Sequence, residues 1–390
     1  MNRGVTIDAM ENALHHVIEQ VRSAHSQRRP LRVCGGGTKG FYGHSVQGEV
    51  LSTQGLSGIV SYEPSELVIT ALAGTPLPEI EHTLAQSGQY LAFEPPHFVE
   101  DNTATPNATS TLGGMVAAGL SGPARASVGA VRDFVLGLHM VNGKAEHLQF
   151  GGQVMKNVAG YDISRLMAGS WGTLGLITQV SLKVLPIPVA DATLVFELPQ
   201  ALALEQINRW CGQPLPINAS CWVADDTPKL FVRLRGAQAA VEAACVRMLK
   251  DKTGHRMDAQ VAAADWRACA DHRLPIFAEA PAEQWLWRLS VPPTTGVMLT
   301  EYPQLIEWHG GLRWVWAPQE AATQIREAAA KVQGSATVFK RQTEGGNGAA
   351  HTSIQVLQAL APPLDQLHRQ IKAAFDPAGI FNPGRLYPDL

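Results

Sequence analysis

The N-terminal segment alternates between polar and apolar positions with the period of a helix. Met10, Leu14, Val17, Ile18 and Val21 recur at intervals of three and four residues. Side chains at this spacing lie on one face of a helix, and polar residues fill the opposite face. The pattern therefore predicts an amphipathic helix over residues 8–27.

Between residues 31 and 185, short apolar runs alternate with loops and a few helical segments. Asn142-Gly143 lies between two such runs and predicts a type I′ hairpin turn. The expected strands are 31–34, 49–52, 58–62, 67–73, 134–141, 145–150 and 174–185, and the expected helices are 76–87, 112–120 and 163–168. This region is therefore predicted to be α+β with short connections.

The pattern changes after Pro186-Ile187-Pro188, where apolar residues begin to recur at every second position. The runs 230–235, 285–290 and 312–316 each place alternate side chains on one face, as strands do, and helical runs at 200–211 and 237–251 separate them. We expect an antiparallel sheet with helices on one face. A last helix is predicted over 364–375, in a segment whose character matches the N-terminal region.

These patterns predict three segments along the chain. Residues 1–189 form the first domain, 190–333 a second domain, and 334–390 a C-terminal return to the first. A chain of 390 residues is long enough for this organisation and for a sizeable core without disulfides.

Composition narrows the class of protein. Hydrophobic residues make up 45% of the chain and charged residues 17%, which is typical of a globular protein. The net charge of −3 gives no support to nucleic-acid binding or to a polybasic membrane anchor. The five cysteines are scattered and none forms a C-x-x-C pair, which favours a reducing compartment and neither a zinc nor an iron–sulfur site. With no signal-like N-terminus and no long apolar run, the sequence predicts a cytoplasmic protein.

The first candidate site is the run Gly35-Gly36-Gly37-Thr38-Lys39-Gly40, directly after a predicted strand. Consecutive glycines let backbone N–H groups surround an anion such as a pyrophosphate, and Lys39 could balance its charge. A tight turn without a ligand is the alternative. A dinucleotide fingerprint of the Rossmann type must open a helix, and residues 41–48 have no helical period. No lysine stands in a P-loop context either.

Two further glycine clusters follow. Residues 111–122 contain Gly113, Gly114 and Gly119 among other small residues. One face of the predicted helix could therefore admit a flat ring system. Tight packing of this helix in a core is the alternative. Residues 169–178 place Gly172 and Gly175 before a strand whose backbone could bind the edge of a base, or simply form a turn.

These clusters, in this order and spacing, resemble the FAD-binding domains of the vanillyl-alcohol-oxidase family, also called the p-cresol methylhydroxylase (PCMH) type. Residues 375–385, Phe-Asp-Pro-Ala-Gly-Ile-Phe-Asn-Pro-Gly-Arg, resemble the C-terminal signature of the same family. More narrowly, residues 74–77, 94–97, 129–137 and 154–162 look like the smaller flavin-binding subunits of bacterial glycolate oxidases. The resemblance implies a PCMH-type FAD-binding domain of two α+β subdomains, with residues 190–333 inserted as an antiparallel α+β cap domain.

The resemblance also implies roles for particular residues. The first loop would hold the pyrophosphate of FAD, the second cluster would lie along the flavin, and Gly175 and Ile177 would contact the adenosine end. Family members that bind FAD covalently through the first loop carry a histidine where this chain has Thr38, so non-covalent FAD is expected. The implied cofactor-binding residues are Gly35, Gly36, Gly37, Thr38, Lys39, Pro96, Gly113, Gly114, Ser121, Gly122, Gly129, Gly175 and Ile177.

The sequence does not identify a catalytic residue. Larger relatives that oxidise D-2-hydroxy acids carry a metal-and-base motif resembling H-x-G-[DE]-G-N-x-H. Residues 344–351 are the nearest match and lack its first histidine, so we interpret them as a loop and expect no metal. His97, beside Pro95-Pro96, is the histidine of most interest, with an ordinary loop histidine as the alternative.

The missing base and metal motif favours a companion subunit. The resemblance implies a complex with a larger FAD-containing subunit and an iron–sulfur subunit, acting on glycolate or a similar small 2-hydroxy acid. It implies no nucleic acid, and contact with the inner membrane only through the partners. A free-standing flavin oxidase of another hydroxy acid or alcohol and a flavin-fold scaffold without turnover are the competing hypotheses.

Overall fold

The computed structural model describes residues 7–98, 109–152, 161–224, 226–279, 281–341 and 355–390. The chain divides into two compact units, and each is discontinuous in sequence. Unit 1 comprises residues 1–120, 130–186 and 359–390, and unit 2 comprises residues 121–129 and 187–358.

Unit 1 is built around a five-stranded antiparallel sheet with the strand order β3-β4-β8-β6-β7. Two small sheets, the parallel pair β1-β2 and the antiparallel pair β5-β9, accompany it. The strands are β1 (Leu31–Cys34), β2 (Glu49–Ser52), β3 (Ile59–Glu63), β4 (Val68–Leu72), β5 (Gln89–Tyr90), β6 (Val135–Val141), β7 (His147–Gly151), β8 (Leu176–Lys183) and β9 (Leu185–Pro186). The helices are α1 (Ile7–Gln27), the 3₁₀ turn η1 (Pro64–Glu66), α2 (Leu77–Gln86), α3 (Leu112–Ala118), α5 (Val131–Phe134), α6 (Ile163–Met167) and α12 (Leu364–Phe375).

Helix α1 packs through its apolar stripe, as the periodicity predicts. Val17, Val21 and Ala24 are buried together with Leu31 of β1 and Phe381 of the C-terminal segment. Leu31 forms a parallel bridge with Phe381 and accepts a backbone hydrogen bond from Asn382. The last residues of the chain therefore extend the small sheet from which the glycine-rich loop leaves.

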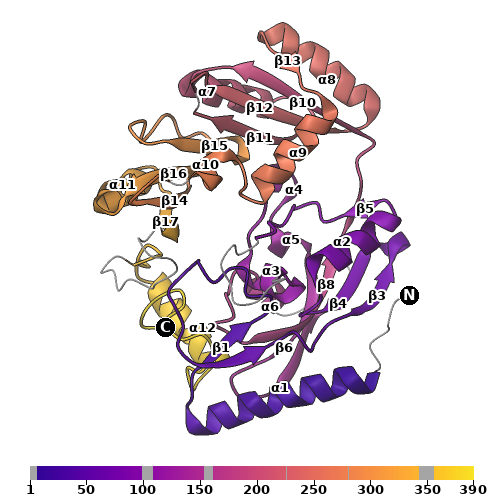
Figure 1. Cartoon of the computed structure of the whole chain (residues 1–390), viewed down its shortest axis with the longest axis vertical. Helices are drawn as coiled ribbons and strands as arrows, with labels where there is room; N and C mark the ends of the chain where they lie inside the picture. Colours follow the sequence, from indigo (N-terminus) through magenta and orange to yellow (C-terminus); the bar gives the residue numbers. More distant parts are fainter. Residues whose placement is uncertain (1–6, 99–108, 153–160, 225, 280, 342–354) are drawn as a thin grey trace. The chain divides into compact units, whose positions relative to one another are not determined.

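Unit 2 is an eight-stranded sheet in the order β13-β10-β12-β11-β15-β16-β14-β17, with every pair antiparallel (Figure 1). The strands are β10 (Ala190–Glu197), β11 (Ile217–Val223), β12 (Lys229–Gly236), β13 (His255–Arg256), β14 (Gln284–Ser290), β15 (Gln304–Glu307), β16 (Leu312–Pro318) and β17 (Ser335–Arg341). The helices are α4 (Arg125–Val128), α7 (Gln200–Cys211), α8 (Gln238–Asp251), α9 (Ala259–Ala270), α10 (Pro275–Ala278), η2 (Trp308–Gly310), η3 (Gln319–Ala321) and α11 (Ala322–Lys331).

The expectation that helices cover one face of this sheet is wrong. Helices α7 and α8 bury Leu194, Phe196 and Val232 on one face. Helix α9 covers the other face, where Trp266 donates a hydrogen bond to Thr193, the neighbour of Leu194 on β10. Because adjacent strand residues point to opposite faces, helices lie on both sides of the sheet.

Two other expectations need correction. The C-terminal return to unit 1 begins at residue 359 and not at 334, because β17 pairs with β14 and belongs to the sheet of unit 2. The turn after β6 is not type I′. Positive φ occurs at Ala145 and at neither Asn142 nor Gly143, because the Asn142 side chain accepts hydrogen bonds from the Lys144 and Glu146 amides and holds a longer loop. The α+β class itself is confirmed, as are the predicted spans of α7 and α12.

Candidate functional site

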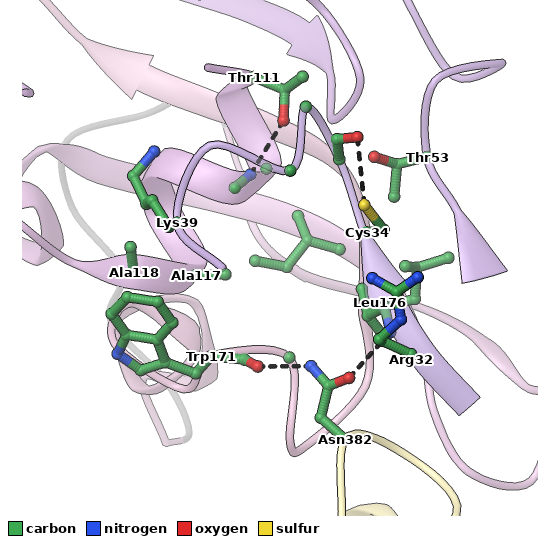
Figure 2. Close-up of a pocket in the computed structure, with 18 of the residues that line it drawn as sticks. Arg32, Cys34, Lys39, Thr53, Thr111, Ala117, Ala118, Trp171, Leu176 and Asn382 are labelled. Atoms are coloured by element: carbon green, nitrogen blue, oxygen red, sulfur yellow. Dashed lines mark hydrogen bonds between the residues drawn. The ribbon is translucent and has the colours of Figure 1, made fainter. Parts of the chain in front are cut away.

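A groove in unit 1 gathers the glycine clusters that the sequence analysis singled out. Nine of the predicted residues line it: Gly35, Gly36, Gly37, Thr38, Lys39, Gly113, Gly114, Gly175 and Ile177. They come from the loop after β1, from α3, and from Gly175 and Ile177 at and just before the start of β8, which are far apart in sequence. Figure 2 labels Lys39 of the first loop and Ala117 and Ala118 of α3 among the residues of this groove. The fold therefore brings three separately predicted clusters to one place.

The loop after β1 has glycines where side chains cannot fit. A Cβ at Gly35 would overlap the Thr111 side chain, and a Cβ at Gly36 would overlap the backbone carbonyl of Thr109. Gly37 has a φ of +76°, which residues with a side chain rarely adopt. No helix follows within residues 41–48, which confirms that this loop does not have the Rossmann context. The loop instead presents backbone to the groove, as an anion-binding nest does.

Lys39 provides the charge that the loop predicts. Its Nζ lies 3.2 Å from Ser110 Oγ and 3.4 Å from Thr38 Oγ1, and these two hydroxyls lie 3.0 Å apart. Among the residues that the structure describes, no carboxylate forms an ion pair with Lys39. Burial lowers the pKa of Lys39 to about 8. The ammonium group also lies over the Phe98 ring, 5.7 Å from its centroid. With hydroxyl and aromatic partners and no ion pair among the described residues, this cation is suited to an anionic ligand, which would satisfy its charge.

Helix α3 brings small residues to the groove. Thr111 caps the helix by accepting a hydrogen bond from the amide of Gly114. Gly113 allows the helix to approach β4 closely, because a Cβ there would overlap Ala73. Gly114, Ala117 and Ala118 line the groove. The helix therefore offers a low-relief surface to a flat group.

Asn382 ties the C-terminal segment to the groove. Its Oδ1 accepts a hydrogen bond of 2.8 Å from the amide of Val33, and its Nδ2 donates one of 2.7 Å to the carbonyl of Trp171. Figure 2 shows Asn382 between Trp171 and β1. One buried side chain thus joins the strand before the glycine loop to the loop before β8.

Arg385 supports the glycine loop from the same segment. Its guanidinium donates hydrogen bonds to the carbonyls of Lys39 and His44, at 2.9 and 3.0 Å. Burial lowers its pKa to about 10. Asn382 and Arg385 both line the groove, and the sequence analysis did not select them as site residues. Their place in the C-terminal signature was the signal that could have identified them.

Four predicted residues do not line this groove. Pro96 is buried in the loop after β5, and Ser121, Gly122 and Gly129 belong to the stretch of unit 2 that interrupts unit 1. The Gly122 carbonyl accepts a hydrogen bond of 3.0 Å from Trp308 Nε1 within unit 2. His97 also lies outside the groove lining, and its Nε2 is 3.0 Å from Glu81. Residues 154–160 of the glycolate-oxidase-like motif and the loop 344–351 lie outside the described residues.

The groove fits a dinucleotide with a pyrophosphate. Backbone amides and a buried lysine meet at the loop after β1, and glycines and alanines continue the surface on either side. Among the described residues that line the groove there is no histidine, and the buried Thr38 hydroxyl lies 3.0 Å from Ser110 Oγ. Among the described residues no cluster of three metal-ligating side chains occurs. In the same residues, no helix is both long and apolar enough to cross a membrane.

Comparison with known proteins agrees with this geometry. Residues 13–151 match the model of the FAD binding domain, and residues 318–386 match the C-terminal domain of FAD linked oxidases. Glycolate oxidase subunit GlcE of Escherichia coli K12 is 42% identical over 374 residues, which cover 96% of this chain and 97% of GlcE. Glycolate oxidase subunit GlcD of Bacillus subtilis is 40% identical over 86 residues, or 22% of this chain and 18% of GlcD.

The fold is also found in a solved structure. Alkyldihydroxyacetonephosphate synthase superposes with a TM-score of 0.63 at 16% identity, covering 95% of this chain and 75% of that one. At this identity the likeness concerns the fold. Together with the near full-length match to GlcE, these findings confirm the predicted family and the cofactor, FAD. The chain belongs to the FAD-linked oxidases with a PCMH-type FAD-binding domain, in the family of glycolate oxidase subunit GlcE.

Proposed function

We propose that this chain is the FAD-binding subunit of a glycolate oxidase complex, which oxidises glycolate, and D-lactate as a second substrate, to the 2-oxo acid. The observation that carries the proposal is the groove of unit 1, with its glycine loop and buried Lys39, in a chain that matches GlcE over nearly its whole length. When bound, FAD supplies the two-electron acceptor that such an oxidation needs.

The residues of the chain would hold the cofactor. We assign Gly35, Gly36, Gly37, Thr38 and Lys39 to the pyrophosphate, through backbone amides, a hydroxyl and an ammonium group. Gly113 and Gly114 would lie along the ring system, and Gly175 and Ile177 at the adenosine end. Non-covalent binding is part of the proposal, because Thr38 stands where covalent members carry a histidine and no histidine occurs among the described residues of the lining.

The remaining parts of the proposal concern partners. The printed name of the GlcE relative describes a subunit, and no residue of this chain has been assigned as a catalytic base. We therefore place this chain in a complex with a larger FAD-containing subunit and an iron–sulfur subunit that take over its electrons. The proposal puts the complex in the cytoplasm, with any contact with the inner membrane made through those partners.

The test is an anaerobic absorption spectrum of the purified chain, recorded before and after glycolate or D-lactate is added. The proposal expects flavin bands that stay oxidised in the isolated chain and bleach when the partner subunits are present. Bleaching in the isolated chain would instead indicate a free-standing dehydrogenase. A colourless chain that does not take up added FAD would contradict the flavin assignment and leave a scaffold.

A matched pair of variants tests the role of the groove. Lys39→Met removes the buried ammonium group, and Lys144→Met removes an exposed one in the loop after β6. We expect Lys39→Met to lose flavin on gel filtration and Lys144→Met to retain it. Equal flavin content in the two variants would contradict the assignment of Lys39.

A further inference from the structure

Unit 2 contains a cavity of its own, of about 520 Å³. Its floor is the sheet face formed by Cys221 of β11, Phe231 of β12, Leu305 of β15 and Trp316 of β16, and its roof includes Trp266 and Cys269 of α9. Every residue that lines it belongs to unit 2, so none is shared with the groove of unit 1. The cavity exists because α9 and α10 cover this second face of the sheet.

Three hydrogen-bonding groups of the walls, those of Trp266, Trp316 and Cys269, have partners within the protein. Trp266 Nε1 donates to Thr193 Oγ1 at 2.9 Å, and Trp316 Nε1 donates to the carbonyl of Ile276 at 2.5 Å. Cys269 Sγ donates to Glu307 Oε1 at 3.3 Å. The N–H groups of both indoles therefore form hydrogen bonds within the protein, and the apolar surfaces of the rings line the cavity.

The charges of the lining argue against a small acid as the occupant. Asp265 and Glu279 are exposed carboxylates and Lys229 is the single ammonium group among the lining residues described. Partial burial raises the pKa of the Asp265 carboxyl. Hydrogen bonding with Cys221, and then burial, raise the pKa of the Cys269 thiol, which keeps it uncharged. Two carboxylates against one ammonium group make this lining unfavourable for an anion such as glycolate.

The size of the cavity is suited to a ligand. Pockets for small molecules commonly measure about 300–1,000 Å³ and are mainly apolar. An apolar cavity of about 150 Å³ holds one benzene molecule, which scales to about 20 non-hydrogen atoms for this one. We infer that the cavity of unit 2 is a second binding site, for an uncharged hydrophobic molecule that contains one or more rings.

The inference is tested with N-phenyl-1-naphthylamine, an uncharged ring compound whose fluorescence rises in apolar sites, added to the FAD-loaded chain. We expect one molecule bound per chain, with a Kd in the micromolar range. Leu274→Trp places a larger side chain in the cavity lining and should weaken binding at least tenfold. The matched control, Leu202→Trp, makes the same change at an exposed leucine of α7, away from the cavity, and should leave the Kd unchanged.

A second measurement does not depend on any variant. Cys221 and Cys269 line the cavity, whereas Cys211 is exposed at the end of α7. Mass spectrometry can measure the rate at which N-ethylmaleimide alkylates each cysteine. The bound probe should slow the alkylation of Cys221 and Cys269 at least fivefold and leave the rate at Cys211 unchanged.

Three results would overturn the inference: no saturable binding, an equal Kd in Leu274→Trp and Leu202→Trp, or unchanged labelling of both buried cysteines. Displacement of the probe by glycolate would also overturn it, because the cavity would then belong to the acidic substrate. None of these results depends on whether glycolate reduces the flavin, so the proposed function is tested separately.

Discussion

The groove of unit 1 and the cavity of unit 2 differ in what forms their walls: mainly backbone in the groove and mainly side chains in the cavity. The groove is walled largely by glycines and by backbone, and its positive charges come from Lys39, Arg32 and Arg385. The cavity is walled by indoles, a phenyl ring and thiols that cover strand faces. A backbone wall tolerates almost no added atoms, whereas a side-chain wall can adjust its rotamers. The two sites should therefore respond differently to substitution.

The largest effect should come from the glycine loop. Gly36→Ala introduces a Cβ that would overlap the Thr109 carbonyl, so the loop cannot keep its conformation. We expect FAD affinity to fall by about 100-fold or more, which corresponds to about 3 kcal/mol. Isothermal titration calorimetry of the FAD-free chain with FAD measures this affinity. Gly55→Ala is the control in the same unit, because its Cβ would meet only Ala13 at an ordinary 3.5 Å. Equal affinity of the two variants would show that the loop is not a rigid wall.

Loss of the buried charge should have the next largest effect. In Lys39→Met the pyrophosphate loses one charge-assisted hydrogen bond, a contribution of about 1.5–3 kcal/mol. FAD affinity should fall by about 10- to 100-fold while the thermal unfolding midpoint of the FAD-free chain stays the same or rises, because a desolvated ammonium group has been removed. A lower midpoint in the FAD-free variant would indicate a structural role.

The pH dependence of FAD binding should reveal the titration of the Lys39 ammonium group. Burial lowers the pKa of Lys39 to about 8 in the FAD-free chain, and a bound pyrophosphate should raise it. Below pH 8 the ammonium group is already charged, and above pH 8 binding must take up a proton. Affinity should therefore be constant from pH 6 to 7 and fall by about tenfold by pH 9. A pH titration in which Lys39→Met falls as steeply as the unchanged chain would exclude Lys39 as the titrating group.

The linkage to the C-terminal segment should have a moderate effect. Asn382→Leu leaves the Val33 amide and the Trp171 carbonyl without their side-chain partner, at a cost of about 1–3 kcal/mol each when buried. Chemical denaturation should show the loss of stability, and FAD affinity should fall several-fold. Asn382→Asp keeps the hydrogen-bond acceptor for the Val33 amide, so it should recover part of the stability and part of the FAD affinity. No difference between the two variants would mean that these hydrogen bonds do not position the groove.

The smallest effect is expected in unit 2. Trp316→Phe keeps an aromatic ring on the sheet and removes the hydrogen bond to the Ile276 carbonyl, worth about 1 kcal/mol. We expect a slightly lower unfolding midpoint and unchanged FAD affinity. A change in FAD affinity as large as that of Lys39→Met would remove the distinction between the two sites.

The same contrast explains what the sequence could predict. Each glycine cluster alone also allowed a tight turn or close packing, but their order and spacing together predicted the groove, and the structure places Gly35, Gly113 and Gly175 in one lining. Asn382 and Arg385 stood in a recognised motif, but the sequence could not show that a side chain near the end of the chain reaches Val33 and Trp171. Only the folded chain brings such residues together.

In unit 2 the strands could be predicted from the sequence, but the faces of the sheet on which the helices pack could not. Alternation identified Trp314 and Trp316 as one face of a strand and Arg313 and Val315 as the other, and all four are buried. Both faces of this strand are therefore covered by other parts of the chain, although Arg313 is charged. The apolar stripe of α9 shows which of its own residues turn inward, such as Trp266 and Cys269, but it does not indicate which face of the sheet they meet. The expectation of helices on one face failed for this reason.

The hydrogen bond between Val33 and Asn382 joins residues 349 positions apart. During synthesis at about 5–20 residues per second, the strand before the glycine loop waits roughly 17–70 seconds for the residue that anchors it. Until then the loop lacks the hydrogen bonds from Asn382 and Arg385, so we expect FAD to bind weakly to the growing chain and cofactor loading to be completed late. A chain cut short before residue 382 should leave the ribosome with a weakened flavin site, so flavin content should report whether translation passed that residue.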